Sequence, residues 1–248
     1  MDELKRVVAV CGSSRAGVPE EKSLTQRMLE NFLEGMAPEY CRIFYPHLMN
    51  IAYCRGCYTC WFKTPGICAI EDDMTEIRAE MDQADLIVLA SPVYVDGLSA
   101  QTKVVLDRII SMLDPLITLD GKGHCRHSLL QPRRQKAVLI SCCGFSEVDN
   151  FDHISSHFKA ICRNLYWQDA GEILLPASGL AFVPKKYDEK FSAIQKAGAE
   201  LSKDGVISTK TTEFISREIL NAAEYQDFLN PYFSRLRVRQ GTRQGVRK

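Results

Sequence analysis

The chain of 248 residues is 46% hydrophobic, so it can bury a full core and fits one α/β domain with an appendage better than two domains. Lysine and arginine number 31, as do aspartate and glutamate, so no net charge draws the protein to nucleic acid or to an anionic membrane. No stretch of about 18 apolar residues could span a bilayer, and no N-terminal run has the pattern of a signal peptide. We expect a cytoplasmic protein without a nucleic-acid or membrane partner.

The end of the chain carries a local positive charge. After Ser234 there is no acidic residue, whereas six residues are basic: Arg235, Arg237, Arg239, Arg243, Arg247 and Lys248. Runs of like charge are typical of a solvated or partner-docked tail, which we favour over the alternative of nucleic-acid binding.

Five short apolar runs are typical of strands that are buried on both faces. In chain order they cover residues 6–11, 41–45, 86–90, 137–141 and 172–175. Helical patterns lie between or after them, at residues 24–35, 73–83, 99–113, 151–166 and 188–201, and a capping box of Ser23 and Gln26 opens the first. Alternating strands and helices predict a parallel sheet with helices on both faces, and a ligand at the carboxyl ends of the strands.

A last helical pattern covers residues 212–233, where apolar positions recur on an otherwise charged segment. We expect an amphipathic helix that either packs on a neighbouring subunit or covers the sheet edge of its own chain. The predicted organisation is an α/β domain at residues 1–204, followed at 205–248 by this helix and the basic tail.

The loop after the first predicted strand is suited to a phosphate group. Small residues let backbone N–H groups approach an anion, serine hydroxyls donate hydrogen bonds, and the start of the next helix adds a positive dipole. The candidate residues follow Gly12 and are Ser13, Ser14, Arg15, Lys22, Ser23, Leu24 and Thr25. Because the loop lacks both the Gly-x-Gly-x-x-Gly and the Gly-Lys-Ser/Thr spacing, a monophosphate is the favoured ligand.

Several motifs together resemble the NAD(P)H-dependent FMN reductase superfamily of flavodoxin-like proteins, over roughly residues 5–180. They are Gly-Ser-Ser-Arg at 12–15, Asp72-Asp73-Met74, Ala84-Asp85, Ser91-Pro92-Val93-Tyr94, and Lys103 with Leu106-Asp107-Arg108. The resemblance implies a flavodoxin-like three-layer sandwich with a five-stranded parallel sheet, FMN as cofactor and NAD(P)H as co-substrate.

By this resemblance, two loops contact the flavin ring. The loop after the third strand would lie along the isoalloxazine through Pro92, Val93 and Tyr94, and a stiff backbone beside an aromatic ring also makes a flat platform. The loop after the fourth strand would meet the dimethylbenzene or pyrimidine side through Cys142, Cys143, Gly144 and Phe145. Since a buried thiol is inert by default, neither cysteine is assigned a catalytic role.

Four cysteines form a compact motif, C-x2-C-x2-C-x7-C, made by Cys54, Cys57, Cys60 and Cys68. Three thiols at every third residue can converge on one cluster, and a fourth can complete four thiolate ligands. Within the superfamily the motif resembles that of the iron-sulfur flavoproteins, which pair a [4Fe-4S] cluster with FMN. The alternatives are plain reduced thiols, a zinc site, or a redox-active disulfide.

A second group of possible ligands, His124, Cys125, Arg126 and His127, lacks the spacing of a shared helical face, and we expect a surface loop there.

The expected function is an FMN-dependent oxidoreductase that moves electrons or hydride from NAD(P)H or a reduced carrier to a quinone, flavin or other acceptor. The flavin supplies the chemistry, so we expect binding residues and no catalytic acid or base. If a cluster is present, electrons would pass from it to FMN across a subunit interface of a homodimer or homotetramer. The alternative is a non-enzymatic flavodoxin-like carrier, although such carriers tend to be acidic and this chain is neutral.

Overall fold

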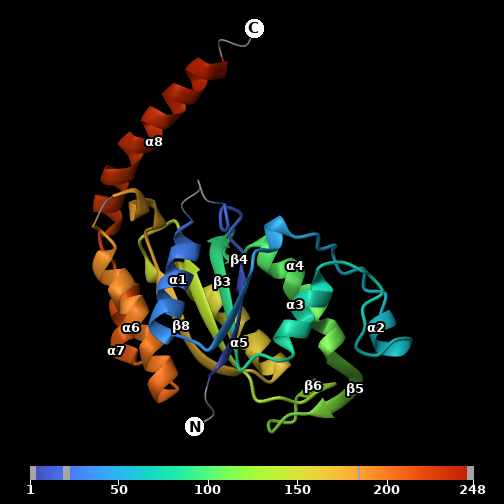
Figure 1. Ribbon diagram of the computed structural model, residues 1–248. Coiled ribbons are helices and arrows are strands. Elements are labelled where there is room, and N and C mark those ends of the chain that lie inside the picture. Colours follow the sequence, from blue (N-terminus) through green and yellow to red (C-terminus); the bar gives the residue numbers. More distant parts are fainter. Residues whose placement is uncertain (1–3, 19–22, 184, 245–248) are drawn as a thin grey trace.

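A central sheet of five parallel strands organises the computed structural model, which describes residues 4–18, 23–183 and 185–244 (Figure 1). The strand order is β2-β1-β3-β7-β8, and a short β4 pairs antiparallel with the end of β3. The strands are β1 (Arg6–Cys11), β2 (Tyr40–Phe44), β3 (Leu86–Tyr94), β4 (Gly97–Leu98), β7 (Lys136–Cys142) and β8 (Gln168–Leu175). The predicted five-stranded parallel sheet is confirmed, and its order reverses between β1 and β3, where such folds bind ligands.

The strands are apolar along their whole length because both faces of the sheet are covered. In β1, Val7 and Ala9 belong to one hydrophobic cluster, whereas Val8 and Val10 belong to the other, and all four are fully buried. This is the two-residue period of a strand with a core on each side.

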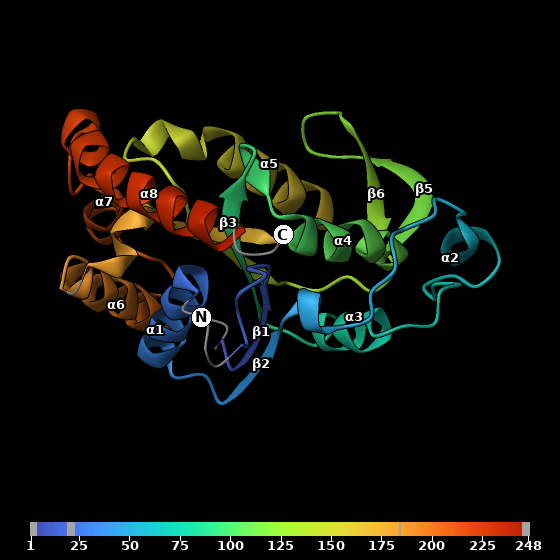
Figure 2. The same ribbon diagram turned by 90° about the horizontal axis from the view of Figure 1, so that it is seen from above.

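Helices form the outer two layers (Figure 2). Helices α1 and α6 contribute to one cluster, and α3, α4 and α5 contribute to the other. Their bounds are α1 (Leu24–Met36), α3 (Met74–Met81), α4 (Ala100–Arg108), α5 (Asp152–Leu165) and α6 (Asp188–Asp204). Helices α1 and α6 pack so closely that a Cβ on Gly198 would overlap the carbonyl oxygen of Phe32, so glycine is required there.

The C-terminal segment corrects one sequence prediction. The prediction of a single helix over residues 212–233 is wrong. Helix α7 (Thr209–Ser216) ends within this range, and a second helix, α8 (Ala222–Gln244), begins after a short break. A contact from α6 and a local capping box cause the break. Lys190 Nζ donates to the carbonyl oxygens of Phe214 and, at 2.8 Å, Arg217 at the end of α7. Asn221 and Glu224 then bond reciprocally, side chain to backbone N–H, as a capping box that starts α8.

The extension covers the edge of its own sheet, which was one of the two alternatives. Ile207 packs on Gly171 of β8, Ile215 is fully buried, and both join the cluster beneath α1 and α6. The first turns of α8 also pack on the body, and its later turns project away from it (Figure 1). The division of the chain after residue 204 stays a prediction.

The region between α4 and β7 also differs from expectation. Helix α4 ends at Arg108, before the predicted residue 113, and continues as a 3-10 turn, η2 (Ile109–Met112). A two-stranded hairpin follows, β5 (Leu113–Leu119) with β6 (Cys125–Leu129), so the surface loop expected at residues 124–127 is wrong. Asp120 closes the hairpin because its carboxylate accepts from two backbone N–H groups of the turn.

The shorter helices are η1 (Pro46–Leu48), α2 (Thr59–Phe62), η3 (Val148–Phe151) and η4 (Ser178–Phe182). Within the described part of the chain, no helix has both the length and the apolar content that crossing a bilayer requires.

Candidate functional site

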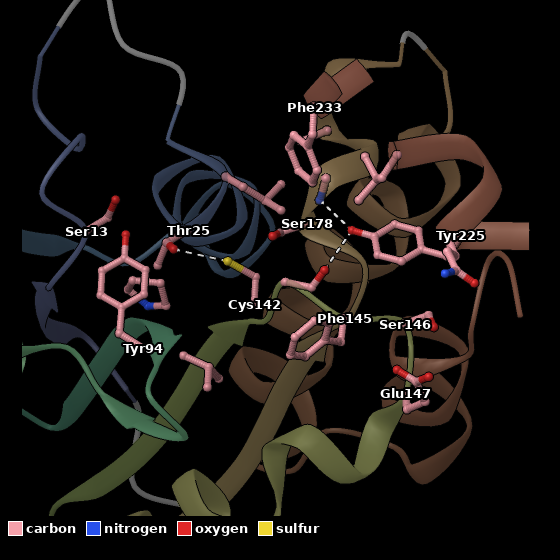
Figure 3. Close-up of a pocket in the computed structure, with 18 of the residues that line it drawn as sticks. Ser13, Thr25, Tyr94, Cys142, Phe145, Ser146, Glu147, Ser178, Tyr225 and Phe233 are labelled. Carbon is pink, nitrogen blue, oxygen red and sulfur yellow. Dashed lines mark hydrogen bonds between the residues drawn. The ribbon is translucent and has the colours of Figure 1, made fainter. Parts of the chain in front are cut away.

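A pocket of about 1000 Å³ opens at the carboxyl edge of the sheet (Figure 3). The loops after β1, β3 and β7 form one part of its lining, and η4 with α8 forms the other. The pocket therefore lies at the edge where the strand order predicts a ligand.

The first loop brings polar groups to the start of α1. Ser23 is the N-cap of α1, accepting from the N–H of Gln26, and its hydroxyl donates to Ser13 Oγ at 2.9 Å. Ser13 and Thr25 line the pocket, so hydroxyl groups and the positive end of the helix dipole face one region. Gly12 is required because a Cβ there would overlap Thr102 Oγ1 at the start of α4. Arg15 adds a cation, which completes an arrangement suited to phosphate.

The loop after β3 is held rigid. Ser141 Oγ donates to the carbonyl of Ser91 at 2.7 Å, and Ser91 Oγ accepts from the N–H of Ser99 at 3.0 Å. Strand β3 continues to Tyr94, beyond the predicted end at residue 90, because it pairs with β4 around a turn in which Val95 has a positive φ. The result is a fixed rim that leaves the Tyr94 ring 48% exposed at the pocket.

The two adjacent cysteines point in different directions. Cys142 lines the pocket and shares a hydrogen bond of 3.4 Å with Thr25, whereas Cys143 belongs to the cluster on the other face of the sheet. Burial raises the pKa of the Cys142 thiol, and it raises the pKa of Cys143 to about 11. Both remain protonated at neutral pH, which agrees with a structural role.

The structure brings most of the predicted contact residues together. Those that line the pocket are Ser13, Arg15, Leu24, Thr25, Pro92, Val93, Tyr94, Cys142, Gly144 and Phe145. Ser14 is exposed, Ser23 is buried as the helix cap, and Cys143 faces away. Lys22 lies outside the described residues. Contact with a cofactor stays a prediction for all of them.

The sequence did not identify twelve other lining residues, which lie on α1, in the loop after β7, in η4 and on α8. They are Arg27, Ser146, Glu147, Ser178, Gly179, Ala181, Ala222, Tyr225, Gln226, Leu229, Asn230 and Phe233. The Tyr225 hydroxyl donates to the carbonyl of Gly144 at 2.7 Å and accepts from the N–H of Gly179 at 3.1 Å. One tyrosine therefore ties α8 to the loops after β7 and β8. The apolar spacing of α8 was visible in the sequence, but the surface it contacts was not.

The four cysteines of the motif line a second cavity, of about 310 Å³. Cys54 and Cys57 are exposed, Cys60 is buried, Cys68 is half-buried, and none of them forms a disulfide. Burial and the neighbouring cysteines raise the pKa of Cys60, whereas hydrogen bonds with Thr59 lower the pKa of Cys57. Among the described residues, no three histidine, cysteine or acidic side chains are placed so that they could hold a metal ion.

A buried ion pair holds the cysteine loop. The side chains of Arg108, at the end of α4, and Asp72 are 1% and 3% exposed. The Arg108 guanidinium donates to both carboxylate oxygens of Asp72, at 2.7 and 3.0 Å. Arg108 also donates to the carbonyl oxygens of Ala52, at 2.7 Å, and Ile70, at 3.3 Å. Both ends of the cysteine loop are thus fastened to one guanidinium, which also lines the cysteine cavity.

The two cavities are separate within one chain. Figures 1 and 2 show α4 between the cysteine loop around α2 and the central sheet, and the linings of the two cavities have no residue in common. The second group of possible ligands lies on the hairpin, where the His127 ring packs against Trp61 with centroids 4.8 Å apart and planes tilted by 49°. His127 therefore supports the cysteine loop by packing.

Comparison with known proteins agrees with this geometry. Residues 5–124 match the family model described as NADPH-dependent FMN reductase. The resemblance to this enzyme family is confirmed over that segment. The matched segment contains the first loop, the β3 rim and the whole cysteine loop, whereas α8 lies outside it.

Relatives with curated names match part of the chain. An iron-sulfur flavoprotein of Archaeoglobus fulgidus is 33% identical over 96 residues, which are 38% of this chain and 43% of the relative. An iron-sulfur flavoprotein of Methanocaldococcus jannaschii is 35% identical over 105 residues, which are 42% of this chain and 51% of the relative. The chain spans about half the length of these two relatives.

A solved structure shares the fold. An FMN-dependent NADH-azoreductase from Bacillus anthracis, in complex with FMN, superposes with a TM-score of 0.60 at 14% identity, covering 80% of this chain and 100% of the azoreductase. At this identity the likeness shows the fold alone, and the predicted flavodoxin-like class is confirmed.

Replacing Arg108 tests the buried ion pair. We expect Arg108→Met to lower the free energy of unfolding by about 3–5 kcal/mol, because Asp72 would be left buried without its partner. The control is Lys103→Met, which removes the exposed pair with Asp107 on the same helix and should cost about 0–1 kcal/mol. Urea denaturation measures the free energy of unfolding of both variants. Equal losses would show that the buried pair contributes no more to stability than the exposed pair.

The pH dependence of stability offers a separate test. Burial alone raises the pKa of Asp72, but hydrogen bonds from Arg108 and two backbone N–H groups outweigh it and hold the pKa below its ordinary value of 3.8. The ionised carboxylate therefore stabilises the fold above about pH 4, and this contribution is lost as the pH falls through the lowered folded-state pKa.

We expect the free energy of unfolding of Asp72→Asn to fall less between pH 5 and pH 2 than that of the wild type, roughly in the window that this linkage defines. Asp107→Asn, in the exposed pair, should keep the wild-type dependence. Parallel curves for wild type and Asp72→Asn in urea titrations would contradict the assignment.

Proposed function

We propose that this protein is an FMN-dependent oxidoreductase that takes hydride or electrons from NAD(P)H or a reduced carrier and passes them to a quinone, flavin or other acceptor. The observation that carries the proposal is the pocket at the carboxyl edge, where ten residues predicted to contact FMN line one cavity of about 1000 Å³. The match of residues 5–124 to NADPH-dependent FMN reductases supports the same conclusion.

The residues present fit FMN in size and chemistry. The cavity is at the upper end of the ~300–1,000 Å³ usual for small-molecule sites. Ser13, Thr25 and Arg15 would hold the phosphate at the start of α1, and the rims around Tyr94 and Phe145 would hold the ring. FMN, when bound, supplies hydride or single-electron transfer, so the protein's part is to position the ring and to donate hydrogen bonds to it.

The four motif cysteines would hold a [4Fe-4S] cluster in this proposal, which supplies one-electron transfer. Their thiols are all reduced and line one cavity, which is the donor set that such a cluster needs. Four thiolates could also hold zinc, but the C-x2-C-x2-C spacing is tighter than the two separated pairs usual in structural zinc sites. The names of the relatives, iron-sulfur flavoproteins, support the cluster over zinc.

The separation of the two cavities bears on assembly. Because α4 lies between them, we propose that electrons reach the flavin from the cysteine loop of a second copy, in a homodimer or homotetramer. The equal numbers of basic and acidic residues favour a small-molecule or protein redox partner over nucleic acid or a membrane. We propose a cytoplasmic location for the protein.

Flavin binding and turnover test the main proposal. We expect the protein to bind FMN, followed by fluorescence quenching, and to oxidise NAD(P)H with ferricyanide as acceptor. Arg15→Ala should weaken FMN binding roughly 10-fold, as expected for the loss of one charge-assisted hydrogen bond. Arg163→Ala, on α5 away from the pocket, is the control. FMN binding without any NADH or NADPH turnover would favour the flavodoxin-like carrier, and no binding at all would refute the proposal.

Iron analysis tests the cluster. Anaerobically purified protein should hold about four irons and four sulfides per chain with a broad shoulder near ~400 nm, and Cys60→Ser should lose most of the iron while still binding FMN. Cys125→Ser, at an exposed cysteine outside the cavity, should keep the wild-type content. Stoichiometric zinc, or flavin bands alone, would contradict the cluster.

A further inference from the structure

The carboxyl-edge pocket has a wall made by none of the residues that were predicted to contact FMN. Figure 3 shows Ser13, Thr25 and Tyr94 on one side and Tyr225 and Phe233 on the other. The second side is built by α8, which turns one face to the cavity with residues spaced three or four apart: Ala222, Tyr225, Gln226, Leu229, Asn230 and Phe233.

This wall is firmly seated. Tyr225 and Leu229 are 6% and 8% exposed, and the Tyr225 hydroxyl bonds to two loops of the body. A Cβ on Gly179 would come within 2.6 Å of that hydroxyl, so the glycine lets the helix approach the loop closely. The wall is a preformed part of the pocket, as ligand sites usually are.

The chemistry of the wall differs from that of the phosphate end. All six pocket-lining residues of α8 are uncharged, whereas Glu224 and Asp227 of the same helix are exposed and do not line the pocket. The cations of the pocket, Arg15 and Arg27, come from the first loop and α1. The face offers apolar carbon together with the amide groups of Gln226 and Asn230.

We infer that the α8 face, together with Phe145 of the loop after β7, is the binding subsite of the electron acceptor, and that it takes an uncharged planar compound with ring oxygens, of the quinone class. The aromatic and aliphatic side chains contact the ring, and the amides donate hydrogen bonds to its oxygens. This inference rests on the proposed function. In the net reaction NAD(P)H gives up a hydride and becomes NAD(P)⁺, and the quinone takes two electrons and two protons, the second proton coming from solvent.

The same observations argue against NAD(P)H at this face. Its phosphates require cations or free helix N-termini. The α8 residues that line the pocket include no cation, and at the start of α8 the N–H of Glu224 is already bonded to the Asn221 side chain. An uncharged acceptor needs only the apolar surface and hydrogen-bond donors that the wall presents.

The test compares two phenylalanines of α8. Phe233 lines the pocket and is 46% exposed, and Phe228 is 42% exposed but does not line it. With 2-methyl-1,4-naphthoquinone as acceptor, Phe233→Ala should raise the KM for the quinone roughly 3- to 10-fold, as for the loss of one aromatic contact. At equal FMN occupancy, this rise should exceed any change in the KM for NAD(P)H and in the rate with ferricyanide. Phe228→Ala should change none of these, and Phe233→Tyr should restore most of the quinone affinity.

The outcomes separate the inference from the proposed function. An equal rise in the NAD(P)H KM for Phe233→Ala, or equal effects of Phe233→Ala and Phe228→Ala, would overturn the subsite. If the protein oxidises no NAD(P)H, the proposed function fails by itself. Calorimetric titration of the same naphthoquinone with FMN in excess then decides the subsite: weaker binding only in Phe233→Ala supports it, and equal binding by all variants overturns it.

Discussion

Arg108 and Asp72 form a buried bidentate ion pair, and the position of the cysteine loop depends on it. The guanidinium also bonds to the carbonyl oxygens of Ala52 and Ile70, so both ends of the cysteine loop are fastened at one point. Removing one partner of a buried pair leaves an uncompensated charge, so the conformation of the cysteine loop depends on both Arg108 and Asp72. The loop can expose three of its cysteines partly or fully and still be held in one conformation.

Helix α4 connects this anchor to the pocket. Arg108 is the last residue of α4. At the other end, the N-cap residue Ser99 donates a hydrogen bond of 2.7 Å to the carbonyl of Gly12, in the loop that faces the proposed phosphate. One rigid helix therefore sets the position of both loops relative to the sheet. The same helix keeps the two cavities apart within a chain, which is why the proposed electron path needs a second copy.

The sequence predicted those features whose cause is local. The strand β1 was predicted to the residue, and Ser23 was identified as the cap of α1, because burial on both faces and capping leave direct patterns. The features it missed depend on contacts between distant segments. The end of α7 is set by Lys190 from α6, the hairpin packs through His127 on Trp61 of α2, and the α8 wall depends on the bond from Tyr225 to Gly144. Asp72 and Arg108 were both noted as motif residues, but their pairing needed the fold.

If the carboxyl-edge pocket holds FMN in one orientation, a crystal structure of the protein grown with FMN will show it. We expect the phosphate within hydrogen-bond reach of Ser13 and Thr25, the ring between Tyr94 and Phe145, and open space beside α8. Flavin density outside this pocket, or a phosphate seated against the uncharged face of α8, would contradict it.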